Sequence, residues 1–169
     1  MKSVTGFGLM LVSMLLFLAW LGLCIVNGFI YEREVGGHLK RAADANTLQL
    51  AEQELVVAVN YLEKHQLTHG YTSIFFTTPD EDVGFWYTNL SASLSELKKL
   101  STDTTRLEQS NTLIKLRETL LDQQQGDTSV TAPSGISRYP HNTLFFWWGW
   151  LSFIFSGLFF LIWIAGRQH

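Results

Sequence analysis

The chain has 169 residues, of which 47% are apolar, and a formal net charge of −3. This length accommodates one modest domain together with two membrane spans, and it excludes two full globular domains. All fifteen acidic residues lie within 32–127, and ten of the twelve basic residues lie within 31–143, so this middle segment has a net charge of −5. The negative charge makes nucleic acid and an anionic lipid surface poor partners.

The first apolar segment, 8–30, contains no charged residue. As a helix it is about 34 Å long, which is enough to cross a hydrocarbon core of about 30 Å. A cleaved signal peptide is the competing interpretation, with Lys2 in its basic region and Asn27-Gly28 near the cleavage site. Because the apolar region of a signal peptide is usually only about 7–15 residues long, we expect residues 1–30 to form an uncleaved signal anchor.

The second apolar segment, 144–165, is also uncharged, and we expect a membrane span over 144–166 with a short tail at 167–169. Tryptophan is concentrated at both ends of this segment: Trp147, Trp148 and Trp150 lie at its start, and Trp163 lies near its end. Since indole rings prefer the headgroup region, these four side chains are the predicted membrane-interface anchors.

The two short tails decide the predicted orientation. Two spans place both termini on the same side of the membrane, and Lys2 and Arg167 make both tails positive. The positive-inside rule therefore predicts cytoplasmic termini and an extracytoplasmic central domain, in the inner membrane of a bacterium.

Residues 31–122 are dominated by helix signals and are expected to form an extracytoplasmic helical hairpin. A first helix is predicted over 34–66, and a second helix begins with Thr78 as its N-cap and Pro79 at its first position. The apolar stripe of the first helix consists of Ala45, Leu48, Ala51, Leu55, Ala58 or Val59, and Leu62. The stripe of the second consists of Val83, Trp86, Leu90, Leu94 and Leu97. Both stripes follow the helical period.

The end of the second helix is less regular. The polar residues 101–104 interrupt it, and Thr105 and Glu108 have the pattern of a capping box that restarts it. Leucine or isoleucine recurs every seven residues at Leu100, Leu107, Ile114 and Leu121, which indicates helix-on-helix packing. Residues 123–143 are rich in Gln, Ser, Thr, Gly and Pro without periodicity, and they are predicted to be a flexible linker.

Two amphipathic helices bury little surface on their own. We therefore expect an all-α membrane protein in which two transmembrane helices flank the hairpin, and in which dimerisation or docking on a partner completes a four-helix bundle. This order of span, helical bundle and span resembles the layout of bacterial chemoreceptor and sensor-kinase input domains. The resemblance covers topology only. Since four residues follow Ala165, we expect no output domain of the kind that those receptors carry.

The connection between the two predicted helices, at about 67–87, is dense in aromatic residues. Six lie within seventeen residues: Tyr71, Phe75, Phe76, Phe85, Trp86 and Tyr87. One interpretation of this tip is a recognition surface or a small-ligand pocket. The other is a small core that caps the distal end of the hairpin. The two interpretations can coexist, with part of the cluster packed while Phe76 or Tyr87 stays exposed.

The sequence offers little for catalysis or metal binding. His65 and His69 have the spacing of two metal ligands on a helix, but Gly70 is expected to end the helix at this point. Cys24, the only cysteine, follows Leu23, which does not fit a lipid-attachment site. No GxSxG motif or phosphate-binding loop is present, and neither span carries an ionisable residue. We therefore expect no enzyme, cofactor, metal site or transporter.

Three functions fit these expectations. The first is a membrane-anchored interaction or scaffold protein whose outer domain binds a second copy of itself or another envelope protein. The second is a ligand-sensing accessory subunit that passes a signal to another membrane protein through its spans. The third is a phage or plasmid exclusion or immunity factor, since such proteins can be small and two-pass.

Overall fold

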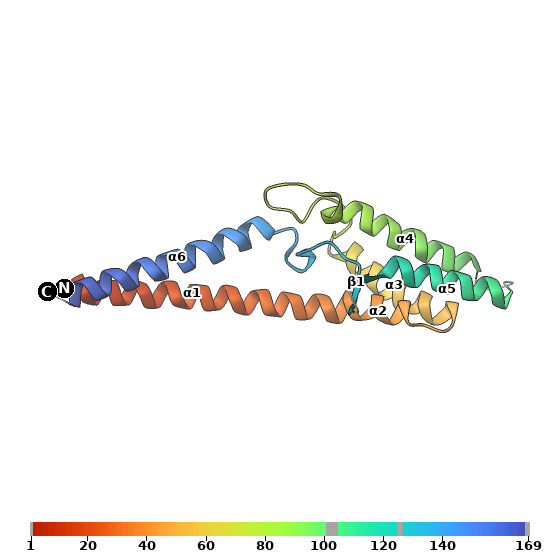
Figure 1. Ribbon diagram of the computed structural model, residues 1–169, viewed down its shortest axis with the longest axis horizontal. Helices are drawn as coiled ribbons and strands as arrows, with labels where there is room; N and C mark the ends of the chain where they lie inside the picture. The colour runs from red at the N-terminus through yellow and green to blue at the C-terminus, as the bar shows by residue number, and fades with distance from the viewer. Residues whose placement is uncertain (1, 101–104, 125–126, 168–169) are drawn as a thin grey trace. The chain divides into compact units, whose positions relative to one another are not determined.

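The computed structural model of the chain describes residues 2–100, 105–124 and 127–167. It is mostly helical and divides into two compact units (Figure 1). The span unit consists of Met1–Gly28 and His141–His169, and the central unit consists of Phe29–Pro140. The predicted interruption at 101–104 and the end of the predicted tail lie outside the described residues.

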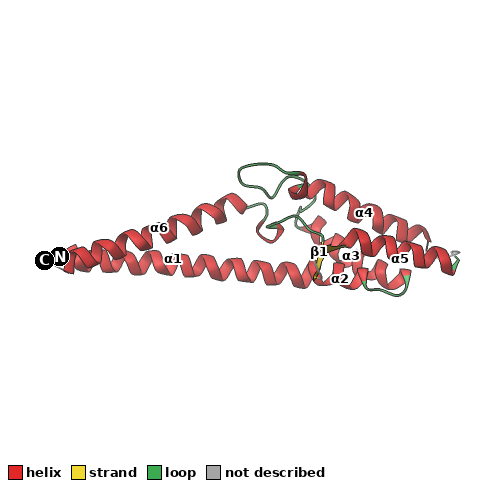
Figure 2. Ribbon diagram, viewed as in Figure 1, coloured by secondary structure: helices red, strands yellow, loops and turns green. Residues whose placement is uncertain are grey.

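The elements follow one another in a simple order (Figure 2). They are α1 (Lys2–Tyr31), η1 (Glu32–Gly36), α2 (Gly37–Ala43), α3 (Leu48–Lys64), η2 (Pro79–Glu81), α4 (Val83–Leu100), α5 (Arg106–Leu120), β1 (Leu121–Gln124), β2 (Asp127–Val130), η3 (Ile136–Arg138) and α6 (Asn142–Arg167). The first of the η elements is a π-helix, and the other two are 3₁₀ turns.

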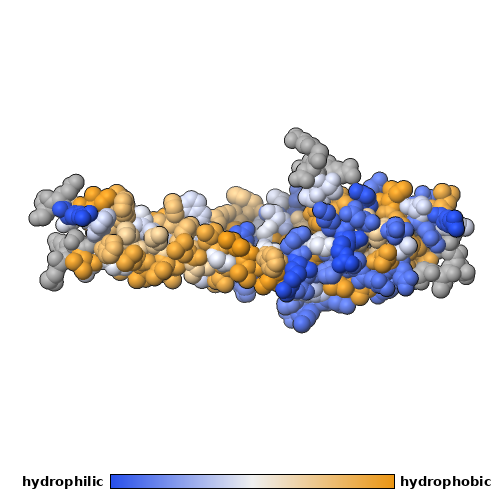
Figure 3. All heavy atoms as spheres, turned by 90° about the horizontal axis from the view of Figure 1, so that it is seen from below, coloured by the Kyte–Doolittle hydropathy of each residue, from blue (hydrophilic) through white to orange (hydrophobic). Residues whose placement is uncertain are grey.

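The span unit contains α6 and the part of α1 up to Gly28. Both helices are long and apolar enough to cross a membrane. Most of their large apolar side chains are exposed, and Figure 3 shows a predominantly hydrophobic surface along them. A helix that is apolar on every side is suited to lipid rather than to water. The prediction of two helices with the length and composition of membrane spans is confirmed.

Helices α1 and α6 pack against each other in antiparallel order. Near the N-terminus of α1 and the C-terminus of α6, the ring centres of Phe7 and Trp163 lie 5.7 Å apart. Further along, Trp20 Nε1 donates a hydrogen bond of 2.7 Å to the carbonyl oxygen of Phe145. Gly149 is buried beneath the same indole, and a Cβ at this position would lie 2.5 Å from a Trp20 ring carbon. Glycine therefore allows the Trp20 ring to lie directly on the α6 backbone.

The four predicted interface tryptophans differ in exposure. Trp147 and Trp150 are about half exposed, whereas Trp148 and Trp163 are partly buried. The guanidinium of Arg167 lies 5.2 Å from the ring centre of Trp163, which is a cation–π distance. Their role as anchors at the two membrane interfaces stays a prediction.

The first predicted helix of the central unit is in fact two helices. Helix α2 ends at Ala43 and α3 begins at Leu48, so the prediction of one helix over 34–66 is wrong. The intervening segment contains Asp, Asn and Thr, whose side chains hydrogen-bond the local backbone and favour turns over helix interiors. Thr47 is the N-cap of α3, and its hydroxyl accepts a hydrogen bond of 3.2 Å from Leu50 N.

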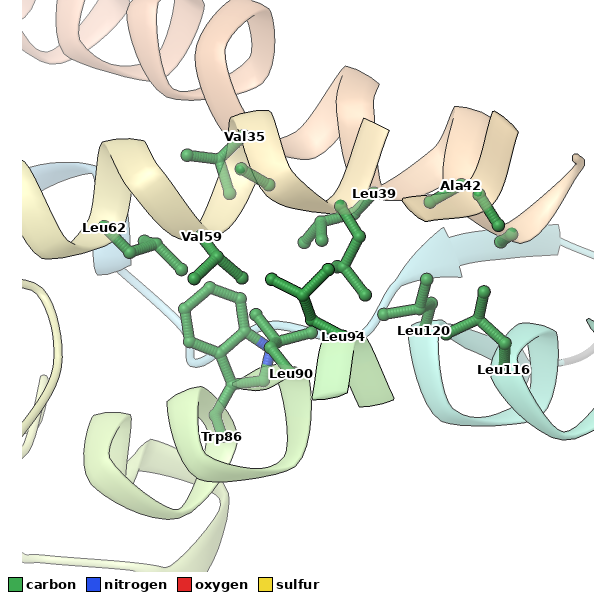
Figure 4. Packing of buried hydrophobic residues seen from close by; sticks show 14 of the residues in the cluster. Val35, Leu39, Ala42, Val59, Leu62, Trp86, Leu90, Leu94, Leu116 and Leu120 are labelled. Carbon is green, nitrogen blue, oxygen red and sulfur yellow. The ribbon is translucent and has the colours of Figure 1, made fainter. Parts of the chain in front are cut away.

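Four helices of the central unit, α2 to α5, share one hydrophobic core (Figure 4). Its largest fully buried side chains are Leu39, Leu55, Leu62, Leu90, Leu97, Leu120, Val35 and Val83. The predicted stripes of α3 and α4 are buried, and Ala45, which precedes α3, is partly buried. Because the central unit contains four helices rather than two, its core forms within a single chain. The premise that the core needs a second chain is therefore wrong.

Helix α4 begins at Val83 and not at Pro79, where the sequence predicts it. Thr78 precedes only the 3₁₀ turn η2, and Asp82 follows with an extended backbone. Asp82 Oδ1 accepts a hydrogen bond of 3.0 Å from Phe85 N, so this carboxylate caps the helix. Three acidic residues precede α4, and the sequence alone does not distinguish which of them is the cap.

Helix α5 begins with the predicted capping box, which is confirmed. Thr105 Oγ1 accepts a hydrogen bond from Glu108 N, and Glu108 Oε2 accepts one of 3.0 Å from Thr105 N. The Thr105 hydroxyl also donates a hydrogen bond of 2.9 Å to Glu108 Oε2. The hydrogen bond from the Thr105 backbone and then that from its hydroxyl hold the pKa of the Glu108 carboxyl below its usual range. Helix α5 is joined to α4 by an ion pair of 2.9 Å between Lys115 and Glu96.

The predicted flexible linker, 123–143, contains regular structure. Strands β1 and β2 form a two-stranded antiparallel sheet, and η3 follows them. Thr131 N donates a hydrogen bond of 2.8 Å to Leu120 O, and Ile136 is buried in the core. The linker prediction is wrong because strands of this length are too short to show an alternating pattern, and their position is set by contacts with the helices.

Candidate functional site

The segment between α3 and α4 contains a closed loop, 70–82, which we call the aromatic loop. Figure 2 shows it in green, immediately before α4. At its stem, Tyr71 pairs with Asp82 in an isolated antiparallel bridge. Beside this bridge, Val83 N donates a hydrogen bond of 2.9 Å to Gly70 O. A surface loop whose two ends are tied together is compact, and its apex presents side chains outward.

The second half of the aromatic loop is held by its own polar groups. Thr72 N donates a hydrogen bond of 3.0 Å to Glu81 O across the stem. Pro79 opens the 3₁₀ turn η2, in which its fixed φ is favourable. Thr78 Oγ1 donates a hydrogen bond of 3.0 Å to Glu81 Oε2. These bonds define the return path from the apex to α4.

Gly70 starts the loop with a φ of +95°, a conformation that side chains with a Cβ rarely adopt. A Cβ here would also collide with the hydroxyl of Tyr139. That hydroxyl donates a hydrogen bond of 2.7 Å to the carbonyl oxygen of His69. The start of the aromatic loop is therefore fixed to the chain segment that leaves the central unit.

The six aromatic residues predicted at the tip have different environments. Four are exposed: Tyr71 at 46%, Phe75 at 63%, Phe76 at 84% and Phe85 at 67%. Trp86 is buried, with its indole beside Val59 in Figure 4, and its Nε1 donates a hydrogen bond of 2.6 Å to Thr131 O. Tyr87 is partly buried, and its hydroxyl donates a hydrogen bond of 2.7 Å to Glu63 Oε1. This hydrogen bond raises the pKa of Tyr87.

The predicted aromatic cluster is thus divided between core and surface. Trp86 fits the interpretation of a packed core residue, and it belongs to the helical core of the unit rather than to a separate cap. Phe75 and Phe76 lie at the apex of the aromatic loop and fit the interpretation of a recognition surface.

The aromatic loop lies at the end of the central unit where the chain enters and leaves it. The exit is marked by Tyr139, whose hydroxyl binds the loop stem. The entrance is marked by Glu34, which lies near Tyr61 in the last turn of α3. Burial of the Tyr61 side chain, and then the negative charge of Glu34, raise the pKa of Tyr61. The expected distal position of the tip is therefore wrong. The chain turns at 44–47, so α3 runs back toward the start of the unit.

Helix α5 is apolar on two sides. Its inner side consists of Leu113, Leu116 and Leu120, which belong to the core or pack against it. Leu107 and Ile114 are 72% and 58% exposed, and we call this pair the α5 ridge. Of the four residues in the seven-residue pattern, Leu121 is buried in the core and Leu100 packs against it, whereas Leu107 and Ile114 are exposed. A spacing of seven does place both residues on one side of the helix, but that side does not face the core.

A polar cluster joins α2 to α3. His38 Nδ1 lies 2.6 Å from Glu54 Oε2, and Arg41 pairs with the other carboxylate oxygen of Glu54. The Glu54 side chain is only 15% exposed, so two partners offset the cost of burying its charge. The cluster explains how a carboxylate is accommodated between two packed helices.

The two histidines with metal-ligand spacing are not on a helix. Helix α3 ends at Lys64, and the ring of His65 packs on Tyr61 with ring centres 4.2 Å apart. A ring nitrogen of His69 lies 3.2 Å from Thr68 Oγ1. Within the described ranges, no group of three or more His, Cys, Asp or Glu residues is placed to hold a metal ion.

Comparison with models of protein families, with curated proteins and with solved structures finds no match for this chain. The function must therefore be inferred from the residues and their geometry.

Proposed function

We propose that this chain is a membrane-anchored interaction protein. Helices α1 and α6 hold it in a bacterial inner membrane with both termini in the cytoplasm, and the central unit acts outside the cytoplasm. The absence of charge from both apolar segments supports their role as membrane spans. The positive charge of both tails supports the orientation. The net negative charge of the middle segment directs the search toward protein partners rather than nucleic acid.

The observation that carries this proposal is the α5 ridge. Leu107 and Ile114 stay exposed although α5 already buries its other apolar side in the core. Large apolar side chains that line up on the outside of a packed helix favour a second helix across them. The partner helix comes from a second copy of this chain or from another envelope protein.

The size of the ridge is consistent with an interaction between membrane-anchored chains. Burying two such side chains contributes roughly 2–4 kcal/mol at about 25 cal/mol per Å². This corresponds to a dissociation constant of about 1 mM or weaker, which is too weak for two soluble proteins at cellular concentrations. Anchoring both partners in one membrane raises their effective concentration, so a contact of this size suffices.

Site-specific photo-crosslinking in intact cells tests the proposal. A photoreactive amino acid at Leu107 or Ile114 is expected to capture a partner, and Gln109, an exposed polar position of the same helix, is the matched control. A product of twice the chain mass identifies a second copy, and a product of another mass identifies a different envelope protein. Equal capture at Gln109, or no product from either ridge position, would contradict the proposal.

A further inference from the structure

The apex of the aromatic loop is apolar and uncharged. Residues 70–79 contain no charged residue, and Phe75 and Phe76 are adjacent at the apex. Phe76 is 84% exposed, which makes it the most exposed large hydrophobic side chain of the described residues. The ordered stem holds this apex outside the core instead of letting it collapse onto the helices.

The position of the stem along the chain limits what the apex can contact. Tyr139, which binds the stem at His69, is three residues before Asn142, where α6 begins. Three residues of extended chain reach at most about 11 Å. Only a short stretch of chain therefore connects the residue that binds the stem to the first residue of α6. Helix α3 packs against η1, the segment that follows the end of α1 at Tyr31.

We propose that the aromatic loop is a lipid-binding element, in which Phe75 and Phe76 insert into the boundary between headgroups and acyl chains of the bilayer that holds α1 and α6. Aromatic side chains favour this region of a membrane. The loop backbone has polar groups at its apex, which keeps the insertion shallow, because unpaired backbone groups are costly in the hydrocarbon core.

The charges around the loop select the kind of lipid surface. Asp80, Glu81 and Asp82 follow the apex directly, and the middle segment of the chain is net negative. Anionic lipids therefore repel this face, so insertion is driven by apolar contact alone and takes place on zwitterionic lipid. The loop gives the central unit an attachment to the membrane in addition to the two spans. This inference needs the spans to lie in a membrane but does not depend on the α5 ridge.

Depth-dependent fluorescence quenching on the full chain tests the inference. The chain carries Cys24→Ser and one new cysteine, Thr77→Cys, labelled with an environment-sensitive dye, so that both apex phenylalanines are retained. It is reconstituted as single copies in phosphatidylcholine nanodiscs, with or without lipids that carry a spin label near the carbonyl end of the acyl chain. A dye at Gln53→Cys, an exposed position of α3, is the matched control.

We expect the dye at Thr77→Cys to show a blue-shifted emission and to lose roughly half of its intensity to the spin-labelled lipid, as for a depth of about 5–10 Å. The dye at Gln53→Cys stays unquenched. The double variant Phe75→Ser with Phe76→Ser abolishes the quenching, and since both side chains are exposed, it leaves the helical circular dichroism unchanged.

Any one of four results would overturn the inference. The first is a water-like emission at Thr77→Cys without quenching. The second is a blue-shifted emission that the spin-labelled lipid does not quench, which would mean that protein and not lipid covers the loop. The third is quenching that persists in the double variant, and the fourth is quenching that appears only when anionic phosphatidylglycerol is added.

Discussion

Phe85 and Trp86 are neighbours in the sequence and have opposite environments. Phe85 is 67% exposed and Trp86 is 7% exposed. Consecutive side chains on a helix point about 100° apart, so these two side chains face in different directions. The spacing of Val83, Trp86 and Leu90 predicts which of the two faces the core, because these residues form one stripe at helical period.

The Trp86 side chain also tests how the β2–η3 segment is held. Replacing Trp86 by Phe keeps most of the apolar contact but removes the Nε1 donor to Thr131 O, so we expect a loss of about 1 kcal/mol. For a unit of this size, such a loss lowers the unfolding temperature by a few degrees. Replacing Trp86 by Ala leaves a cavity and is expected to cost about 3–5 kcal/mol.

Thermal unfolding of the full chain in detergent, followed by circular dichroism, measures both effects. Trp150→Phe is the matched control, since Trp150 is about half exposed and lies in the span unit. If Trp86→Ala were as stable as the unchanged chain, the assignment of Trp86 to the core would be wrong.

The exposure of Phe76 is an example of what the sequence could not predict. The residues around it, 70–79, have neither a helical nor an alternating period that would separate buried from exposed positions. Their positions depend on the stem, which is closed by backbone hydrogen bonds such as that from Val83 N to Gly70 O. Residues of almost any type can make such backbone hydrogen bonds, so the closure of the loop could not be predicted from the residue types.

At the scale of elements, periodic features and the capping box that starts α5 could be predicted, whereas the break at 44–47 and the two strands could not. The apolar stripes of α3 and α4 and the capping box of α5 follow from spacing and cap chemistry, and they are present in the structure. The break at 44–47 and strands β1 and β2 involve only a few residues each. Hydrophobic periodicity is evaluated over windows about as long as a helix, and such windows do not resolve features this short. The break changes the number of helices and thereby the whole packing scheme.

The contact between α1 and α6 provides a second test at this scale. A side chain at position 149 would collide with the Trp20 ring, so we expect Gly149→Ile to displace the indole and to break its hydrogen bond to Phe145 O. Gly157 of the same helix has no neighbour within 4 Å of an added Cβ, and Gly157→Ile is therefore the matched control.

The readout is crosslinking between the two helices in membranes. Cysteines replace Phe17 and Phe153, whose ring centres lie 5.9 Å apart, in a Cys24→Ser background, and a short bifunctional thiol reagent joins them. We expect Gly149→Ile to reduce the yield several-fold and Gly157→Ile to leave it unchanged, since a collision of this kind typically costs about 1–3 kcal/mol. Equal yields in both variants would refute the close contact at Gly149.

For the whole molecule, the direction of the chain decides where the functional surfaces lie. A two-helix hairpin places the aromatic segment as far as possible from both spans. The additional turn at 44–47 places it instead next to Tyr139, at the end where the chain leaves the central unit. Local patterns predict which residues form helices. A turn that is not predicted, however, reverses the direction of the next helix, and the loop that follows then lies at the opposite end of the unit.

The proposed orientation rests on the charge of the two tails and is the basis of the extracytoplasmic role proposed for the central unit. Lys2 and Arg167 are the basic residues that flank the two apolar helices on the tail side. The positive-inside rule places basic residues that flank a span on its cytoplasmic side. With the termini in the cytoplasm, the protein contact proposed for the α5 ridge and the lipid contact proposed for the aromatic loop both lie on the outer side of the membrane.

Thiol labelling of intact cells tests this orientation most directly. A single cysteine at Ser134, an exposed position of the central unit, in a Cys24→Ser background, is treated with a membrane-impermeant maleimide before and after lysis. We expect full labelling in intact cells, with no increase on lysis. Labelling that appears only after lysis would place the central unit in the cytoplasm and contradict the proposed function.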